Sequence, residues 1–223
     1  MTYHAIMASP LGDILLRADA AGLSGLYFAD QSDCPPVPGL PRHRARASRP
    51  SDGTLAGQEI RHFKAYRADV DDLFAPAPAH LPPLSAQPGA SDAARPRLLQ
   101  DDTPPEAVGL FQSVQKQLAE YFAGHRTVFD VPISLQGTEF QKKVWLALLA
   151  IPYGTVVSYG DVARSAGLTP RHGRPVGTAV GRNPVSIIIP CHRVVSGTRA
   201  LTGYTGGLER KLALLELEGF KLY

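Results

Sequence analysis

Three side chains with distinct chemistry follow one another in the C-terminal half of the chain, namely Cys191, His192 and Arg193. Pro190 precedes them, and the isoleucines at 187–189 before it have the β-branched composition of a buried strand. Because proline cannot donate a hydrogen bond to a sheet, the predicted strand ends there. We therefore expect a thiol, an imidazole and a guanidinium in the turn after an apolar strand, where functional residues often lie.

The chemistry that this cluster could perform begins with the thiol of Cys191. A thiolate is a nucleophile, and nearby cations lower the pKa of a thiol. Local sequence leaves a second interpretation open, because a cysteine after three isoleucines is as often a small buried hydrophobic residue. Neighbouring residues on a strand also point to opposite faces, so the adjacency of Cys191 and His192 is weak evidence that they act together.

Composition excludes several classes of protein. The 223 residues are 44% hydrophobic and 19% charged, as in soluble globular proteins of one or two domains. There is no apolar run of 18 residues and no signal-peptide pattern, so we expect neither a membrane span nor export. Two cysteines, Cys34 and Cys191, are too few for a disulfide framework or a four-cysteine zinc site. We expect a cytoplasmic protein with reduced thiols and no metal.

The net charge of +3 is unevenly distributed along the chain. From Thr138 to the end there are 11 Lys and Arg against 5 Asp and Glu, a net charge of +6, whereas the residues before Thr138 carry −3. A basic half favours an anionic partner, and nucleic acid is the first candidate. A solvated basic surface would explain the same asymmetry, so charge alone does not identify the partner.

The sequence predicts an N-terminal α/β domain over residues 1–130 and a C-terminal domain over residues 131–223. Alternating apolar residues and turn signals predict three short antiparallel strands within residues 1–30. Residues 33–105 contain 13 of the 20 prolines, together with many Ala and Arg, which predicts a mostly disordered insertion. Within it, residues 55–73 could form a short helix or strand.

Two capping-box patterns mark the starts of helices. Thr103 with Glu106 predicts the start of a helix at the end of the N-terminal domain. Thr138 with Gln141 predicts the first helix of the C-terminal domain. The aromatic and aliphatic residues that follow each box recur at helical spacing and are expected to face the core.

A helix-turn-helix pattern follows in the C-terminal domain. Ser158 is expected to cap a short helix over residues 159–166, Gly167 to make the turn, and a second helix to lie within residues 169–181. Pro175 would remove a hydrogen bond from the interior of that helix, so the helix proper is expected to start near it. Small residues alternate with arginines here, which would let the helix lie in a DNA groove. An ordinary pair of antiparallel helices would fit the pattern too.

A glycine-rich loop and a final helix complete the chain. The loop, residues 197–207, would allow a ligand to approach backbone amides closely, but it lacks the ending of a phosphate-binding loop. The last helix is predicted over residues 208–219. Glu218 lies near its C-terminal end, where the helix dipole disfavours a carboxylate. This carboxylate therefore either points to water or has a specific cationic or imidazole partner.

Four motifs in this order and spacing resemble one family, the O6-alkylguanine-DNA alkyltransferases, also called methylated-DNA–protein-cysteine methyltransferases. The resemblance is strong over residues 121–219 and weaker over residues 1–30. It implies an α+β fold, in which a small N-terminal β-sheet and helix domain of RNase H-like type precedes a mostly helical domain with a helix-turn-helix. The matching motifs are residues 190–194, which match the active-site motif in full, and residues 156–160, 181–184 and 203–208.

The resemblance implies DNA repair by direct reversal of damage. A monomer would flip the damaged nucleotide out of double-stranded DNA, because chemistry on a base requires access to it. The alkyl group of O6-alkylguanine, and of O4-alkylthymine, would move to Cys191 in one irreversible turnover without a cofactor or a membrane. His192 would act through a bound water as the base, and Glu218 would orient His192. Tyr159 would donate to the leaving base, and Asn183 would hold the turn before the site.

The resemblance also assigns the DNA-binding and pocket residues. Arg174 would fill the gap that the flipped nucleotide leaves. The family usually has small residues on both sides of this arginine, and Pro175 departs from that pattern. The other residues expected to contact DNA are Gly173, Pro175, Gly177, Thr178 and Arg182, and those expected to line the base pocket are Tyr204, Thr205 and Val194.

Two other functions are compatible with parts of the sequence. A protein that binds alkylated DNA without removing the lesion would share the helix-turn-helix but lack the nucleophile, so Cys191 argues against it. A cysteine hydrolase acting on small molecules would use the thiol repeatedly. The helix-turn-helix pattern and the basic half argue against that hydrolase, and multiple turnover of an ester or amide would support it.

Overall fold

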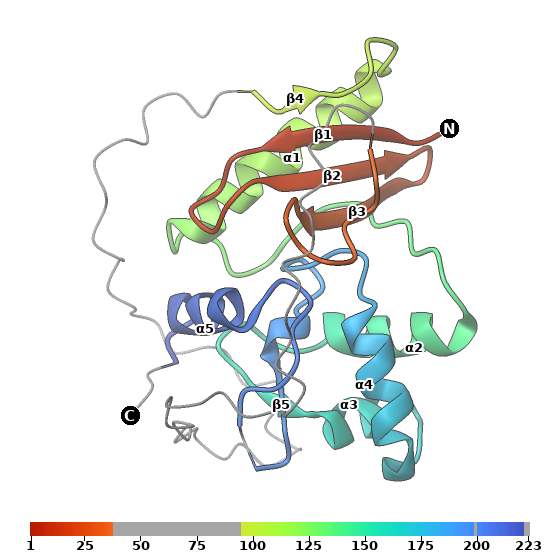
Figure 1. The fold of residues 1–223 in the computed structure, drawn as a ribbon, viewed down its shortest axis with the longest axis vertical. Coiled ribbons are helices and arrows are strands. Elements are labelled where there is room, and N and C mark those ends of the chain that lie inside the picture. Colours follow the sequence, from red (N-terminus) through yellow and green to blue (C-terminus); the bar gives the residue numbers. More distant parts are fainter. Residues whose placement is uncertain (38–94, 199, 221–223) are drawn as a thin grey trace.

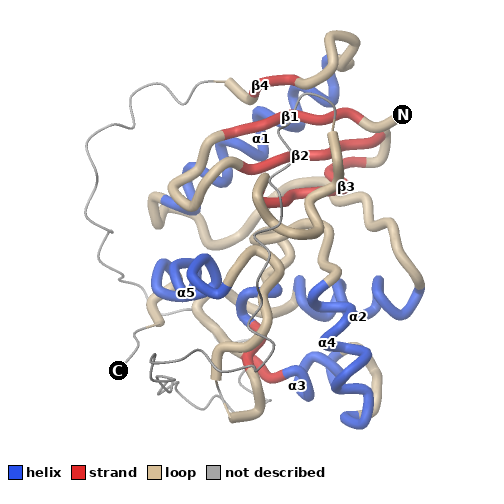
Figure 2. Tube along the Cα trace, viewed as in Figure 1, coloured by secondary structure: helices blue, strands red, loops and turns tan. Residues whose placement is uncertain are grey.

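The computed structural model describes residues 1–37, 95–198 and 200–220. A small antiparallel sheet and one long helix form the upper part of the molecule in Figure 1, and the remaining helices form the lower part. Figure 2 shows the same division by type of secondary structure. The combination of helices with a small antiparallel sheet agrees with the predicted α+β class.

The N-terminal sheet has four strands in the order β3-β2-β1-β4. Strands β1 (Tyr3–Met7), β2 (Ile14–Asp19) and β3 (Gly22–Phe28) confirm the three predicted antiparallel strands. The two-residue strand β4 (Arg97–Leu98) pairs antiparallel with β1. Helix α1 (Pro105–Phe122) packs on the sheet, and its apolar face joins the sheet residues in one core.

Of the predicted insertion over residues 33–105, the structure describes residues 33–37 and 95–105. The start of α1 in the second range was predicted, but β4 was not. Composition missed β4 because two residues on a sheet edge need little apolar sequence to pair. The possible helix or strand at residues 55–73 lies outside the described residues.

One of the two predicted capping boxes is present. Helix α2 (Glu139–Leu149) starts with the predicted box, in which the Gln141 N–H donates to Thr138 Oγ1 at 3.2 Å and the Thr138 N–H donates to Gln141 Oε1 at 2.9 Å. Helix α1 has no such box, because Pro104 is its N-cap and has no side chain that can accept a hydrogen bond. Thr103 therefore lies one residue too early to cap the helix.

The predicted pair of short helices is present. Ser158 caps α3 (Tyr159–Ser165), and Gly167 makes the turn with a φ of 69°. After one turn of 3-10 helix the chain enters α4 (Gly173–Gly181), two residues earlier than predicted. Pro175 is the third residue of α4, within the first turn, where backbone N–H groups have no partner inside the helix. Its missing N–H therefore costs no helical hydrogen bond.

Residues 187–189 are buried but do not form the predicted strand. They make a turn in which Ile187 has a φ of 70° and the Ile189 N–H donates to the Val185 carbonyl at 2.9 Å. Strand-like pairing occurs just before the turn, where Val185 forms a parallel bridge with Leu26 on the free edge of β3. The apolar run had indicated burial correctly, but periodicity cannot distinguish a short buried strand from another buried backbone shape.

The C-terminal part contains a second small sheet and the last helix. Strands β5 (Val157–Ser158) and β6 (Val194–Val195) pair in parallel, and α5 (Leu208–Leu217) follows the glycine-rich loop. One hydrophobic core contains residues of the N-terminal sheet, of α1, α2, α4 and α5, and of the turn that carries Cys191. Within the described ranges, no helix is both long and apolar enough to cross a membrane.

Candidate active site

Cys191 is the first residue of a 3-10 turn and is held by a buried asparagine. The side chain of Cys191 is only 5% exposed. Asn183 Nδ2 donates to Cys191 Sγ at 3.0 Å and to the Ile189 carbonyl at 2.8 Å, while Asn183 Oδ1 accepts from the Val185 N–H at 3.0 Å. The side-chain amide of Asn183 thus hydrogen-bonds to both the beginning and the end of the turn that carries Cys191 Sγ.

Glu218 is the C-cap of α5, and its carboxylate is buried and surrounded by hydrogen-bond donors. Its Oε1 lies 2.9 Å from His192 Nε2 and accepts from the Tyr121 hydroxyl at 2.8 Å. Arg193 donates to both carboxylate oxygens, from Nε at 2.8 Å and from an Nη at 2.9 Å. The Gly154 N–H donates to Oε2 at 3.2 Å. Glu218 therefore has the imidazole and cationic partners that its place at the helix end suggested.

The charges in this cluster fix the state of the imidazole. Burial would raise the pKa of Glu218, but the hydrogen bond of His192 and the hydrogen bonds and charge of Arg193 outweigh burial and hold it well below its usual range. Burial lowers the pKa of His192, which leaves the ring neutral near pH 7. Since Nε2 faces a carboxylate, it carries the proton, and Nδ1 presents its lone pair. His192 Nδ1 is buried and has no hydrogen-bond partner in the described part of the protein.

The thiol of Cys191 is not activated by the two basic residues that follow it in the sequence. Burial raises the pKa of Cys191 to about 11, although the Asn183 hydrogen bond and the Lys211 charge both lower it. His192 is neutral, and the guanidinium of Arg193 is paired with Glu218. The expectation that these neighbours would lower the pKa of the thiol is therefore wrong, and a base must take its proton.

Lys211 is a buried lysine that sequence reasoning missed. Its Nζ donates to the Val194 carbonyl at 2.5 Å and to the Thr202 carbonyl at 2.8 Å. Burial lowers the pKa of Lys211 to about 8. A sequence signal existed, because Lys211 lies on the helix face of the buried Leu214 and one turn before it. The side chain of Val194, which was predicted to line the base pocket, is buried in the core.

The other predicted pocket residues lie in and beside the glycine-rich loop. The Tyr204 hydroxyl is buried and has no hydrogen-bond partner of ordinary geometry among the described residues. Thr205 Oγ1 donates to the Gly181 carbonyl at 2.7 Å, which joins the loop to the end of α4. Thr202 Oγ1 lies 3.4 Å from the Tyr159 hydroxyl. The loop thus connects Tyr159, at the start of α3, with α4.

Helix α4 has one buried face and one exposed face. Its buried face packs in the core, where Trp145 Nε1 donates to the Ala179 carbonyl at 2.9 Å. Spacings of four residues place Arg174, Thr178 and Arg182 along the opposite face. Of the residues predicted to contact DNA, Arg174, Pro175, Thr178 and Arg182 are exposed, and Gly173 and Gly177 are half-buried.

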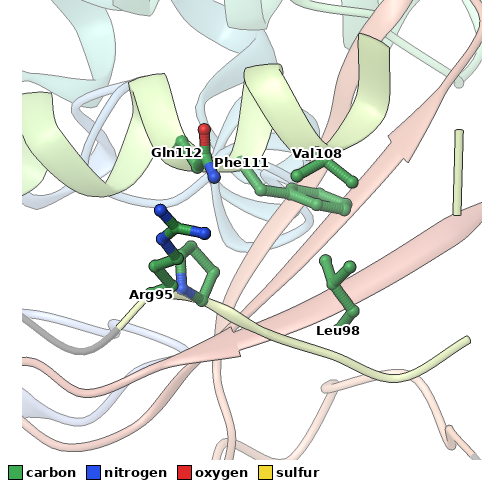
Figure 3. Close-up of a pocket in the computed structure, with 6 residues that line it drawn as sticks. Arg95, Leu98, Val108, Phe111 and Gln112 are labelled. Atoms are coloured by element: carbon green, nitrogen blue, oxygen red, sulfur yellow. The ribbon is translucent and has the colours of Figure 1, made fainter. Parts of the chain in front are cut away.

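A separate pocket of about 150 Å³ lies between β4 and α1 (Figure 3). None of the predicted site residues contributes to it. No group of three or more His, Cys, Asp and Glu residues in the described ranges is placed to hold a metal ion. The residues that line the pocket are Arg95, Pro96, Leu98, Val108, Phe111 and Gln112.

The sequence is similar to proteins of one family. Residues 139–220 match the model described as 6-O-methylguanine DNA methyltransferase, DNA binding domain. The methylated-DNA–protein-cysteine methyltransferase of Mycobacterium tuberculosis is 54% identical over 110 residues, which are 49% of this chain and 66% of that relative, just under two thirds of its length. The methylated-DNA–protein-cysteine methyltransferase of Methanosarcina acetivorans is 50% identical over 109 residues, which are 49% of this chain and 69% of that relative.

Solved structures extend the similarity to almost the whole chain. The crystal structure of Mycobacterium tuberculosis O6-methylguanine methyltransferase has a TM-score of 0.59 at 32% identity and covers 98% of this chain and 93% of its own. The structure of Mycobacterium tuberculosis OGT in complex with DNA has a TM-score of 0.62 at 32% identity, with coverages of 96% and 92%. This chain belongs to the methylated-DNA–protein-cysteine methyltransferase family.

Proposed function

We propose that this protein repairs DNA by moving the alkyl group from O6 of an alkylated guanine, and from O4 of an alkylated thymine, to Cys191. The observation that carries the proposal is the buried cluster of Cys191, His192 and Glu218, in which the imidazole is neutral and presents Nδ1 as an acceptor. A buried thiol that needs a base and a neighbouring base that can accept a proton are complementary.

The proposed reaction is one nucleophilic displacement. His192 Nδ1 takes the thiol proton through a bound water, and Glu218 stabilises the imidazolium that forms. The sulfur of Cys191 attacks the alkyl carbon, a C–S bond forms, the C–O bond breaks, and the electron pair stays on the base. Tyr159 donates a proton or hydrogen bond to that base. A thioether has no good leaving group, so each chain reacts once, and no cofactor enters the step.

The proposed base pocket lies against the glycine-rich loop. The damaged nucleotide is flipped out of the duplex, and its base takes the place beside Tyr204, whose buried hydroxyl can then pair with the base edge. The hydroxyl of Thr205 already donates to Gly181, so Thr205 contributes by fixing the loop. Val194 supports the pocket from the core, because its side chain is buried.

The proposed DNA-binding element is the helix-turn-helix of α3 and α4, with α4 in a groove of double-stranded DNA. The exposed face of α4 supports this role, because Arg174 and Arg182 lie on it two helical turns apart. Arg174 fills the gap left by the flipped nucleotide, and Arg182 contacts phosphate. Gly173, Pro175, Gly177 and Thr178 allow a close approach of the duplex.

Three further assignments are part of the same proposal. The N-terminal domain ends near residue 130, has an RNase H-like fold and contains the insertion at residues 33–105. The C-terminal domain, residues 131–223, carries the DNA-binding and alkyl-acceptor sites. The protein acts as a monomer in the cytoplasm.

Intact-protein mass after mixing with a duplex that contains O6-methylguanine tests the proposal. The expected result is the gain of one methyl mass per chain at one equivalent of duplex, and no gain for Cys191→Ser. Tight binding of the damaged duplex without a mass gain would instead identify a lesion-binding protein. Repeated turnover of an ester or amide would identify a hydrolase.

A further inference from the structure

Arg210, in the first turn of α5, connects the pocket loop with two parts of the N-terminal sheet. Its Nε donates to the Leu11 carbonyl in the β1–β2 turn at 2.8 Å. One Nη donates to the Gly206 carbonyl in the glycine-rich loop at 3.0 Å, and the other donates to the Asp30 carboxylate, just after β3, at 2.9 Å. In Figure 1, α5 lies below the β1–β2 turn, between the sheet and β5.

The guanidinium of Arg210 also lies over the aromatic ring of Phe28, the last residue of β3. The Arg210 guanidinium carbon is 4.3 Å from the centroid of the Phe28 ring. Gly206 is packed so closely that an added Cβ would lie 3.0 Å from Phe28 and 2.7 Å from the ring of Tyr204. Phe28, Gly206 and Tyr204 therefore pack in a row from the sheet to the pocket. The guanidinium of Arg210 lies on the ring of Phe28.

The pocket loop is also held from its other side. Thr205, next to Gly206, donates to the Gly181 carbonyl at the end of α4 at 2.7 Å. The loop is thus fixed between the proposed DNA-binding helix and the N-terminal sheet. Loss of the Arg210 contacts would release only the sheet side, and the α4 side would stay attached.

We propose that Arg210 is a positioning residue for alkyl transfer, which holds the pocket loop against the N-terminal sheet and so places Tyr204 relative to Cys191. This inference rests on the proposed function. Arg210 does not touch the reacting atoms, and its effect acts through Gly206 and Phe28.

Arginine suits this position better than lysine. The planar guanidinium offers donors in fixed directions, and here they reach two carbonyl groups and one carboxylate while the flat face lies on Phe28. Asp30 is half exposed, so the ion pair alone contributes little in water. The directional hydrogen bonds to Leu11 and Gly206 are the part of the arrangement that an ammonium group cannot reproduce.

Single-turnover methyl transfer from an O6-methylguanine duplex tests this inference with Arg210→Met and Arg210→Lys. The rate at saturating duplex should fall about tenfold in Arg210→Met, because a misplacement of about 1 Å can cost roughly a hundredfold and here the α4 side of the loop stays attached. The affinity for undamaged duplex should stay within twofold, since α4 is not touched. Arg126→Met is the matched control, because Arg126 also pairs with a carboxylate, that of Glu120 at 2.7 Å, and with a carbonyl. Its saturating rate should equal that of the unchanged chain.

The outcomes separate a positioning role from a structural one. The inference would be overturned if folded Arg210→Met had a lower melting temperature but an unchanged transfer rate at saturating duplex. It would also be overturned if Arg210→Met lost only affinity for DNA. If Arg210→Met does not fold, Arg210→Lys decides, since it keeps the charge and the alkyl stem. A reduction of its saturating rate by threefold or more supports the inference, and an unchanged rate overturns it. A chain with native Arg210 that transfers no methyl group refutes the proposed function itself.

Discussion

Glu218→Gln is expected to destabilise the folded protein by removing the single carboxylate that faces Arg193, His192 and Tyr121. The substitution is nearly isosteric, so packing is unchanged. It removes one negative charge and replaces an acceptor oxygen by an NH₂ donor. On either orientation of the amide, this NH₂ faces an N–H of Arg193, because Arg193 donates to both carboxylate oxygens.

The size of the effect follows from burial. Arg193 is 6% exposed and Glu218 is 3% exposed, so the guanidinium would lose its counter-charge inside the protein. Breaking a buried ion pair by removing one partner costs about 3–5 kcal/mol. At roughly 2–4 °C per kcal/mol for a chain of this size, the melting temperature should fall by about 6–20 °C.

The same carboxylate gives the stability a defined pH dependence. Because the pKa of Glu218 is depressed in the folded state, its contribution is complete above the unfolded pKa of about 4.3 and is lost as the pH falls toward the folded value. The unchanged chain should therefore lose stability below about pH 5 through this group. Glu218→Gln should lack that component, and the two stability curves should converge in acid.

Unfolding can be followed by the fluorescence of Trp145, the one tryptophan of the chain, which is buried and hydrogen-bonded to Ala179. Tyr121→Phe is the matched control, since it removes one neutral donor to the same carboxylate and should cost about 1.5–3 kcal/mol, less than the loss of the carboxylate. The reasoning is refuted if Glu218→Gln is no less stable than Tyr121→Phe at pH 7, or if the difference between them persists in acid.

Two further predictions concern the transfer reaction and DNA binding. Lys211→Met should lower the transfer rate below about pH 8, where Lys211 is charged and its charge lowers the pKa of Cys191. Rates measured from pH 6 to 8 that superimpose on those of the unchanged chain would contradict this. Arg182→Ala should weaken duplex binding and reduce the slope of log affinity against log salt by about 1. An unchanged salt slope in a titration would show that Arg182 does not contact phosphate.

Local signals in the sequence predicted several elements of the fold. The caps at Thr138 and Ser158 were predictable because the side chain that accepts and the residue three positions later form one short pattern. The type of partner that Glu218 contacts was also predictable, because a carboxylate at a helix C-terminus requires either water or a cationic or imidazole group. The pair of short helices α3 and α4 was predicted from the same local rules.

Tertiary contacts account for what the sequence could not show. Tyr121 is 97 residues from Glu218 along the chain, and its aromatic spacing indicated only a core residue. Arg210 and Leu11 are separated by 199 positions. Residues 187–189 were predicted as a strand, because no pattern in them records that the pairing with β3 is made by Val185, just before the turn.

The resting site keeps both partners of the proposed proton transfer uncharged. Arg193 is paired with Glu218, and Glu218 in turn fixes the proton of the neutral His192 on Nε2, so neither residue supplies a positive charge to the thiol. A buried Cys191 with a pKa of about 11 is a poor nucleophile toward molecules that merely diffuse past it. Its reactivity therefore depends on a base held in place by Glu218 and on a substrate held in the pocket. This arrangement suits the proposed reaction, in which the nucleophile is used once.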